Sequence, residues 1–232
     1  MLDWSYFDKI YCITTKESFI RRSSCKIIAK EYNMDVCFKK VERHPGGSNH
    51  GCFISHMNIF KEAKDQNLQR IIILEDDIIP RYLNEKVLNK ITDFLQNNEW
   101  DLFYFGAVPD CRRDNSAIKV KDRFYRIRSL CTHAYAINRS AIEKFHDSQY
   151  YSHIPLDYLF RDDVSLVSYA HYPTQFYQET GVNAPQPFIN AYLRMVEFYA
   201  YHCGMSLYHP ILQSIICIIF LILFIKSISS AS

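Results

Sequence analysis

Residues 71–77 read Ile-Ile-Ile-Leu-Glu-Asp-Asp, and this stretch is the most informative in the chain. Four consecutive apolar residues, three of them β-branched, predict a fully buried central strand. Three consecutive carboxylates cannot stay inside a core unless positive charge neutralises them. We therefore expect the strand to end at a cleft where the carboxylates hold a divalent cation, since oxygen ligands suit Mg²⁺ or Mn²⁺. The alternative is a solvated acidic turn or helix start, and Pro80 fits both interpretations.

The overall composition is that of an ordinary folded protein. The chain has 232 residues, enough for one domain with a sizeable core. Hydrophobic residues make up 48% and charged residues 22% of it, which argues against disorder. Lys and Arg total 27 against 25 for Asp and Glu, a formal net charge of +2. This near-balance gives no support for nucleic acid as a partner.

Eight cysteines are spread along the chain, and none of them forms a Cys-x-x-Cys pair. This spacing disfavours a zinc site and predicts buried free thiols. The first residues, Met-Leu-Asp-Trp-Ser, lack the basic region and apolar stretch of a secretory signal. We therefore expect the folded part of the chain to lie in a reducing compartment.

The C-terminal part has a different composition. Residues 211–225 contain two polar side chains, Gln213 and Ser214, and Lys226 follows them. The run is short against the roughly 20 residues that span a bilayer, but apolarity on every face suits a membrane better than a domain surface. We predict one folded domain over residues 1–205 and, over 206–232, a hydrophobic helical tail that anchors the chain by a single pass. The alternative is a terminal helix buried against the domain or a partner.

Strands and helices alternate in the first half of the chain, which predicts a parallel sheet with ligands at its carboxyl edge. The second half departs from this alternation, and two of its strands, 124–127 and 132–137, have an antiparallel character. The fold class is therefore α/β, a mixed sheet flanked by helices. Residues 150–163 and the Pro-rich chain after residue 169 are predicted to be irregular. The predicted strands are 9–14, 36–41, 71–74, 101–105 (ending at Gly106), 124–127, 132–137 and 166–169, and the predicted helices 17–32, 51–65, 84–96 and 139–146.

Two motifs together resemble glycosyltransferase family 25, which includes lipooligosaccharide galactosyltransferases and collagen hydroxylysine galactosyltransferases. The first is the helix start Gly-Cys-Phe-Ile-Ser-His at residues 51–56, and the second is the acidic strand end at 71–77, about twenty residues later. Two departures accompany them. The family usually has Asn-Leu after its first strand, where this chain has Thr14 and Thr15. It often has Gly-Glu before the Gly-Cys pair, where residues 48–50 are Ser-Asn-His.

Three further pieces are similar to the same family, so the resemblance covers roughly residues 8 to 180. Residues 132–137, with Ala141 and Phe145 after them, resemble its later strand–helix unit. Ile-Pro-Leu-Asp at 154–157 resembles its downstream aspartate motif, and Arg21 is placed like the arginine after its first strand.

The resemblance implies a GT-A-type, Rossmann-like catalytic domain that transfers a hexose, galactose in the first place, from a UDP-sugar to a glycan or protein acceptor. It implies inversion at the anomeric carbon, a divalent cation (Mn²⁺ or Mg²⁺) as cofactor, and a place in lipopolysaccharide biosynthesis or a related glycosylation. A cation held by Asp76 and Asp77 would stabilise the charge of the departing diphosphate. Asp77 is thus also a catalytic candidate, and Asp157 is the candidate base for the acceptor hydroxyl. The alternative for Asp157 is a turn or helix cap.

Other residues are candidates for donor binding. Arg21 could pair with the diphosphate, or could be a surface charge of a helix. Glu75 could ligate the metal or orient the site indirectly. Ser55 and His56 lie one turn into the second helix, near the acidic strand, and a structural role is the alternative for both. His171 could supply a late metal or phosphate contact.

Two other function classes compete with sugar transfer. One is a non-catalytic relative that binds a nucleotide sugar or serves as a scaffold. The other is a metal-dependent phosphoryl-transfer enzyme, which the lack of a Gly-x-x-x-x-Gly-Lys loop disfavours. If the tail inserts into a membrane, we expect the catalytic domain to remain cytoplasmic, because no signal precedes it. Protease protection in intact vesicles would contradict that location.

Overall fold

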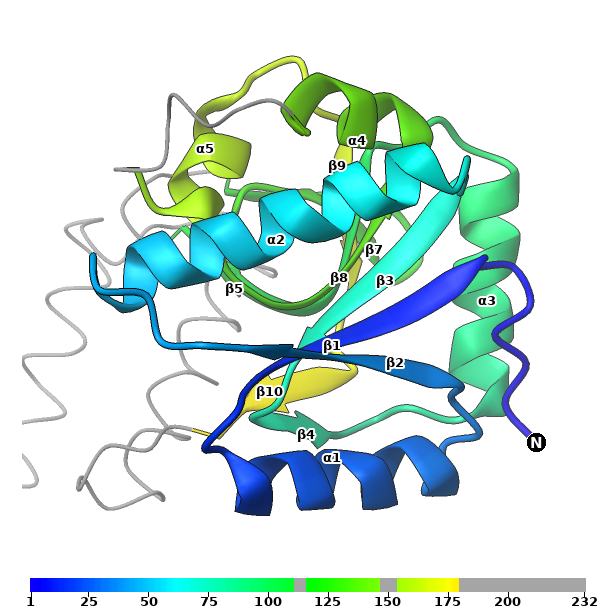
Figure 1. Ribbon diagram of the computed structural model, residues 1–232. Helices are drawn as coiled ribbons and strands as arrows, with labels where there is room; N and C mark the ends of the chain where they lie inside the picture. The colour runs from blue at the N-terminus through cyan, green and yellow to red at the C-terminus, as the bar shows by residue number, and fades with distance from the viewer. Residues whose placement is uncertain (111–115, 147–153, 180–232) are drawn as a thin grey trace, which may run out of the picture.

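The computed structural model describes residues 1–110, 116–146 and 154–179. Its main feature is an eight-stranded mixed sheet in the order β2-β1-β3-β8-β5-β9-β7-β6 (Figure 1). The strands are β1 (Lys9–Thr15), β2 (Val36–Val41), β3 (Arg70–Glu75), β4 (Ile78–Pro80), β5 (Leu102–Pro109), β6 (Ala117–Lys121), β7 (Phe124–Ile127), β8 (Ser129–Asn138), β9 (Ser168–His171) and β10 (Phe176–Gln178). The helices are α1 (Phe19–Glu31), α2 (Ser48–Asp65), α3 (Glu85–Gln96), α4 (Arg139–Phe145) and α5 (Leu156–Asp162).

The first three strands of the sheet are parallel, as the sequence predicts. β1 pairs with β2 on one side and with β3 on the other, and both pairings are parallel. The helices α1 and α2 connect them. The carboxyl ends of these strands therefore meet at one edge of the sheet, where Thr15, Val41 and Glu75 are the last strand residues.

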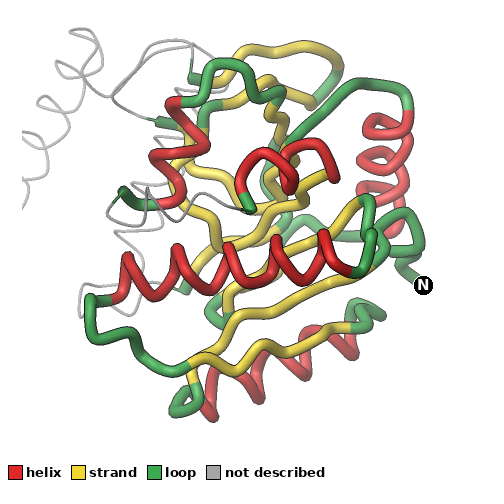
Figure 2. Tube along the Cα trace, turned by 45° about the horizontal axis from the view of Figure 1, so that its top comes forward, coloured by secondary structure: helices red, strands yellow, loops and turns green. Residues whose placement is uncertain are grey.

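The sheet separates two hydrophobic cores, and β3 contributes to both by simple alternation. Ile71 and Ile73 pack in the core that α2, α4 and α5 cover. Ile72 and Leu74 pack in the core under α1 and α3. Figure 2 shows the strands between these helical layers. All four side chains are buried, so the prediction of a fully buried inner strand is confirmed.

The second half of the sheet is mainly antiparallel. β8 lies between β3 and β5 and is antiparallel to both. β7 is antiparallel to β6 and β9. The two strands predicted at 124–127 and 132–137 are therefore confirmed as antiparallel strands, although they pair with other strands and not with each other.

Several predicted boundaries are wrong. The fourth predicted strand does not end at Gly106, because β5 continues to Pro109 through a register shift against β8. The region predicted as irregular at 150–163 contains α5, whose Leu156 and Phe160 are buried in the first core. The last strand lies at 168–171 and not at 166–169. The short strands β4, β6 and β10 were not predicted, and β10 pairs with β4.

The predicted hydrophobic tail at 206–232 lies outside the described residues. Among the residues that are described, no helix combines the length and the apolarity needed to cross a bilayer. The tail, the membrane anchor and the cytoplasmic location stay predictions.

Candidate active site

A cavity of about 420 Å³ opens at the carboxyl edge of the three parallel strands. Its walls come from the ends of β1, β2 and β3, from the start of α1, and from the first turns of α2 with the loop before it. The lining includes every donor-binding and metal candidate predicted from the sequence, namely Arg21, Ser55, His56, Glu75, Asp76 and Asp77. Residues far apart in the sequence meet here, such as Thr14 and Asp76, which are 62 positions apart.

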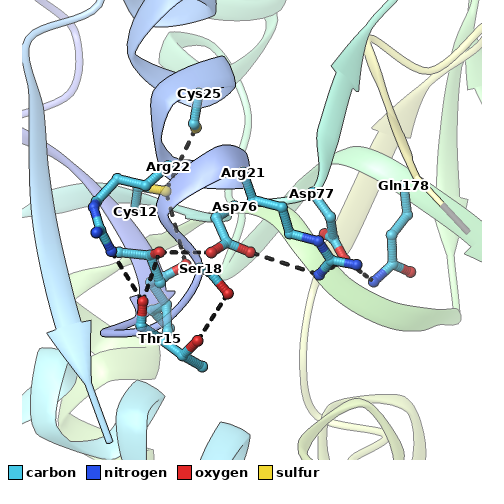
Figure 3. Close-up of polar contacts among 11 residues, drawn as sticks. Cys12, Thr15, Ser18, Arg21, Arg22, Cys25, Asp76, Asp77 and Gln178 are labelled. Carbon is cyan, nitrogen blue, oxygen red and sulfur yellow. Dashed lines mark hydrogen bonds and ion pairs between the residues drawn. The ribbon is translucent and has the colours of Figure 1, made fainter. Parts of the chain in front are cut away.

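Asp76 and Asp77 share one arginine at the mouth of the cavity. Arg21 Nη1 lies 3.4 Å from Asp77 Oδ2 and 3.8 Å from Asp76 Oδ1. Thr14 Oγ1 donates to Asp76 Oδ2 at 2.6 Å, and Gln178 Nε2 donates to Asp77 Oδ2 at 3.2 Å. Figure 3 shows the guanidinium of Arg21 beside Asp76, with Asp77 and Gln178 on its other side. Each carboxylate therefore accepts a hydrogen bond from one neutral side chain, and the two carboxylates share the single positive charge of Arg21.

The acidic pair is short of positive charge. The Asp77 side chain is only 10% exposed, and its Oδ1 atom is buried without a hydrogen-bond partner among the described residues. Burial, together with the negative charges of Glu75 and Asp76, raises the pKa of Asp77 to about 6, against the opposing effect of Gln178 and Arg21. An all-oxygen donor set with an unpaired buried oxygen fits a hard divalent cation. Asp76 and Asp77 thus have the oxygen donors that Mg²⁺ or Mn²⁺ would need.

Glu75 points to a different set of neighbours from the two aspartates. Cys52 Sγ lies 3.8 Å and His56 Nε2 lies 3.9 Å from Glu75 Oε1. His56 is buried, and its Nδ1 shares a 2.8 Å hydrogen bond with Tyr135 Oη. Ser55 Oγ donates to the Gly51 carbonyl at 2.6 Å, within the same helix. These candidates line the cavity together with the aspartates but do not contact them directly through a hydrogen bond or ion pair among the contacts described.

Asp157 does not line the cavity. Its Oδ1 accepts from the backbone N–H of Tyr158 at 3.0 Å, and its Oδ2 accepts from that of Cys131 at 3.2 Å. Cys131 has a φ of 72°, which turns its N–H toward this carboxylate. Asp157 is near enough to raise the pKa of the Cys52 thiol, although burial and Glu75 raise it more. The carboxylate therefore lies in the first turn of α5, where it accepts from two backbone amides.

His171 does not join the site. It lies on β9, where its ring meets that of Phe124 and its Nδ1 contacts Gln175 Nε2 at 3.2 Å. It lines a separate cavity near Lys90 and Arg123. Burial lowers the pKa of this imidazole, and the nearby cations add to the effect. The suggested late metal or phosphate contact is not supported by this position.

The sequence reasoning missed several residues of the site. Gln178 is 101 positions from Asp77 and reaches it only because β10 pairs with β4, so no local pattern identifies it. Thr14 had been noted as a departure from the family, and it contacts Asp76. Arg43 and His44 also line the cavity. The one sequence feature that could have identified these two residues is their position just after β2, at the same edge of the sheet.

The backbone at the start of α2 adds a further element to the cavity. Gly47 precedes the helix with a φ of 95°, in the region that favours glycine. As the N-cap residue, Gly47 has no side chain that could accept from the first amides of this helix. Because Gly47, Ser48 and Gly51 line the cavity, the positive end of the α2 dipole borders it. Such helix starts are suited to phosphate groups.

Residues 2–160 match the family model of glycosyltransferase family 25, described as an LPS biosynthesis protein. The chain belongs to glycosyltransferase family 25. A segment of this family 25 chain is 34% identical over 58 residues to procollagen galactosyltransferase 2 of Homo sapiens, covering 24% of the chain and 9% of that relative. Another match, procollagen galactosyltransferase 1-A of Xenopus laevis, is 26% identical over 107 residues, covering 45% of the chain and 17% of the relative.

The curated relatives are thus much longer than the segments that match this family 25 chain. Among solved structures, A197 from STIV aligns with a TM-score of 0.50 at 12% identity, covering 74% of this chain and 86% of that one. At this level of identity the likeness concerns the fold alone. The family assignment that the motifs predicted is confirmed by the match over residues 2–160.

Proposed function

We propose that this family 25 chain transfers a hexose from a UDP-sugar to a glycan or hydroxylated acceptor, with inversion at the anomeric carbon. Galactose is the leading candidate for the hexose. The observation that carries the proposal is the convergence of Arg21, Asp76 and Asp77 at a cavity bordered by the start of α2. A nucleoside diphosphate needs positive partners and a cation, and this edge of the sheet offers Arg21, the start of α2 and two carboxylates that would hold a cation. The galactose assignment comes from the names of the relatives.

The chemistry divides among the residues of the site. Arg21 and the uncapped amides of α2 would bind diphosphate oxygens, since a guanidinium and a helix start both suit phosphate. Asp76 and Asp77 would hold a divalent cation, which would stabilise the charge of the diphosphate leaving group. As the bond from the anomeric carbon to the diphosphate breaks, the acceptor oxygen forms its bond from the opposite face. The acceptor proton passes to a carboxylate, for which Asp157 is the candidate.

The decisive experiment measures turnover of a panel of UDP-sugars by the full chain, with and without Mn²⁺, in the presence of simple galactoside and hydroxylysine acceptors. We expect manganese-dependent release of UDP from UDP-galactose that exceeds release from UDP-glucose. Manganese-dependent binding of UDP without turnover would favour the non-catalytic relative that the sequence left open. A folded protein that binds none of these donors would contradict the proposal.

Asp157→Asn should lower kcat by about 10²–10⁴-fold, the usual contribution of a general base, while donor affinity stays within about twofold. The amide keeps one acceptor oxygen for the backbone but cannot take a proton. Asp162→Asn, at the other end of α5, is the matched control and should keep wild-type kcat. The measurement is steady-state transfer alongside UDP binding by calorimetry. Equal kcat in Asp157→Asn and wild type would assign Asp157 to a structural role alone, as an acceptor for two backbone amides.

A further inference from the structure

A thiol, an imidazole and a carboxylate converge in the cavity wall, beside the Asp76–Asp77 pair and distinct from it. Cys52, His56 and Glu75 each offer one donor atom, and these atoms lie within 4.8 Å of one another. Two of the separations are 3.8 Å, from Cys52 Sγ to Glu75 Oε1, and 3.9 Å, from His56 Nε2 to the same oxygen. Ligands of a tetrahedral Zn²⁺ ion lie about 2.0–2.3 Å from the metal and hence about 3.3–3.8 Å apart. The three atoms are therefore spaced to surround one ion after small side-chain shifts.

The Nε2 atom of the His56 imidazole faces Glu75. Its side chain is 0% exposed, and among the described residues its Nε2 has no hydrogen-bond partner. Its Nδ1 shares a hydrogen bond of 2.8 Å with Tyr135 Oη, and the two rings stack with centroids 5.6 Å apart. When Nδ1–H donates to Tyr135, Nε2 keeps a free lone pair. Metal-binding histidines are oriented in this way by a partner on the other ring nitrogen.

The backbone holds the ligands on two rigid elements. Cys52 and His56 are four residues apart on α2, so they lie on one face of the helix. Glu75 is the last residue of β3, an inner strand of the sheet. A thiolate and a carboxylate together balance the charge of a divalent cation. The Cys52 thiol releases its proton to solvent when the metal binds.

We propose that Cys52, His56 and Glu75 form a site for a thiophilic divalent cation of the Zn²⁺ class, with a fourth coordination position open to the cavity. Thiolate and imidazole ligands favour Zn²⁺, whereas the oxygen ligands of Asp76 and Asp77 favour Mg²⁺ or Mn²⁺. Three protein ligands with an open position distinguish such a site from a closed structural one. The site stands on these contacts alone and does not depend on the proposed sugar transfer. In the sequence, the lack of a Cys-x-x-Cys pair disfavours zinc. Cysteine spacing alone does not show that Cys52 lies next to His56 and Glu75 in the fold.

Titration of the full, metal-free and reduced chain with Co²⁺ tests the proposal directly. A thiolate bound to Co²⁺ gives a charge-transfer band in the near ultraviolet. We expect this band to saturate at one equivalent, to disappear on addition of Zn²⁺, and to persist in a large excess of Mg²⁺. Zn²⁺ should also raise the Tm of the wild-type chain, since it binds the folded state. Absence of both the band and the Tm shift in wild type would overturn the proposal.

Four variants identify the ligands. Cys52→Ser should lose the band, and His56→Gln should weaken Zn²⁺ binding by at least about 100-fold, more than loss of an outer partner costs. Tyr135→Phe, which removes only that outer partner, should weaken it by about 10–100-fold. Cys37→Ser is the matched control, because Cys37 is a half-buried free thiol on β2 that does not line the cavity. A band and Zn²⁺ affinity unchanged in both Cys52→Ser and His56→Gln would overturn the assignment.

One further variant separates this site from the oxygen site and from the proposed function. Asp76→Asn should keep the Co²⁺ band and the Zn²⁺ affinity, because Asp76 contacts Thr14 and Arg21 and not the three ligands. If the chain transfers sugar, the same variant should lose manganese-dependent turnover. A wild-type chain that binds Zn²⁺ at this site without any transferase activity would refute the proposed function and leave the zinc site intact. Loss of the Co²⁺ band in Asp76→Asn would refute the separation of the two sites.

Discussion

Asp77→Asn should lower kcat for sugar transfer by about 10³-fold. Asparagine keeps the shape of the side chain and can still accept from Gln178 Nε2. It removes the negative charge that would hold the cation. Asp93→Asn, on the exposed surface of α3, changes the net charge in the same way and should keep full activity. Unchanged turnover in Asp77→Asn would remove this carboxylate from the reaction.

The same substitution should make the metal-free protein more stable at neutral pH. The pKa of Asp77 is raised in the folded state from 3.8 to about 6. The stabilisation that the protonated carboxyl provides is thus complete below about pH 4 and is lost as pH rises through 6. We therefore expect the free energy of unfolding of Asp77→Asn to exceed that of wild type above pH 6, and the difference to shrink toward pH 4. Urea unfolding in EDTA at several pH values measures it.

If the difference in the free energy of unfolding between Asp77→Asn and wild type did not change with pH, Asp77 would have an ordinary pKa in the folded state. A less stable Asp77→Asn at pH 7 would mean that Arg21 and Gln178 stabilise the carboxylate more than burial destabilises it. In that case, the lack of positive charge that we ascribe to the site would not exist. The activity result and the stability result are independent, so each can fail alone.

Gly106→Ala should destabilise the fold by about 3 kcal/mol or more, at the upper end of overpacking effects. A Cβ at this position would lie 2.1 Å from His133 Nε2, 2.7 Å from His133 Cδ2 and 2.9 Å from the Phe176 carbonyl oxygen. None of these neighbours can move cheaply. His133 is buried on β8 next to β5, and Phe176 belongs to β10, which also carries Gln178. The urea midpoint at constant m-value measures the effect.

Two further variants test whether the contact with His133 is the cause. Gly51→Ala is the control, because its Cβ would come no closer than 3.1 Å to the His44 side chain and alanine favours the helix. It should change stability by less than about 1 kcal/mol. His133→Ala in the Gly106→Ala background should recover part of the loss, which gives a favourable coupling energy in a double-mutant cycle. Strictly additive effects would show that the imidazole is not the obstacle.

Local patterns predicted the elements that begin and end where the sequence has its own signals. The strand at 71–74 and the helix at 84–96 appear almost unchanged as β3 and α3, because apolar periodicity and the Asn84 cap are local properties. Asn84 accepts from the Val87 amide at 3.0 Å, as a helix-capping asparagine should. β1, β2 and β3 run parallel because a helix connects each strand to the next one in the sequence. Their parallel direction places the acidic residues at the carboxyl edge of the sheet.

Other elements depend on partners that are distant in the sequence. The strand β5 continues past Gly106 because its pairing with β8 resumes after a register shift at that residue. No local sequence pattern predicts this continuation. The helix α5 is short, and it forms where Leu156 and Phe160 can be buried against α2 and β8. The three-residue strand β10 has no periodicity to detect, and it exists because β4 offers a partner.

The sequence by itself determined the family and the sheet edge at which the acidic residues 75–77 lie. It could do so because these depend on residue order along single elements. Only the tertiary structure decided which groups surround the carboxylates. Gln178 and Arg21 contact Asp77, whereas Cys52 and His56 lie near Glu75. Asp77 and Glu75 nevertheless belong to the same run of three acidic residues, 75–77. Successive residues at a strand end point in different directions, so adjacent carboxylates meet different partners and acquire different chemistry.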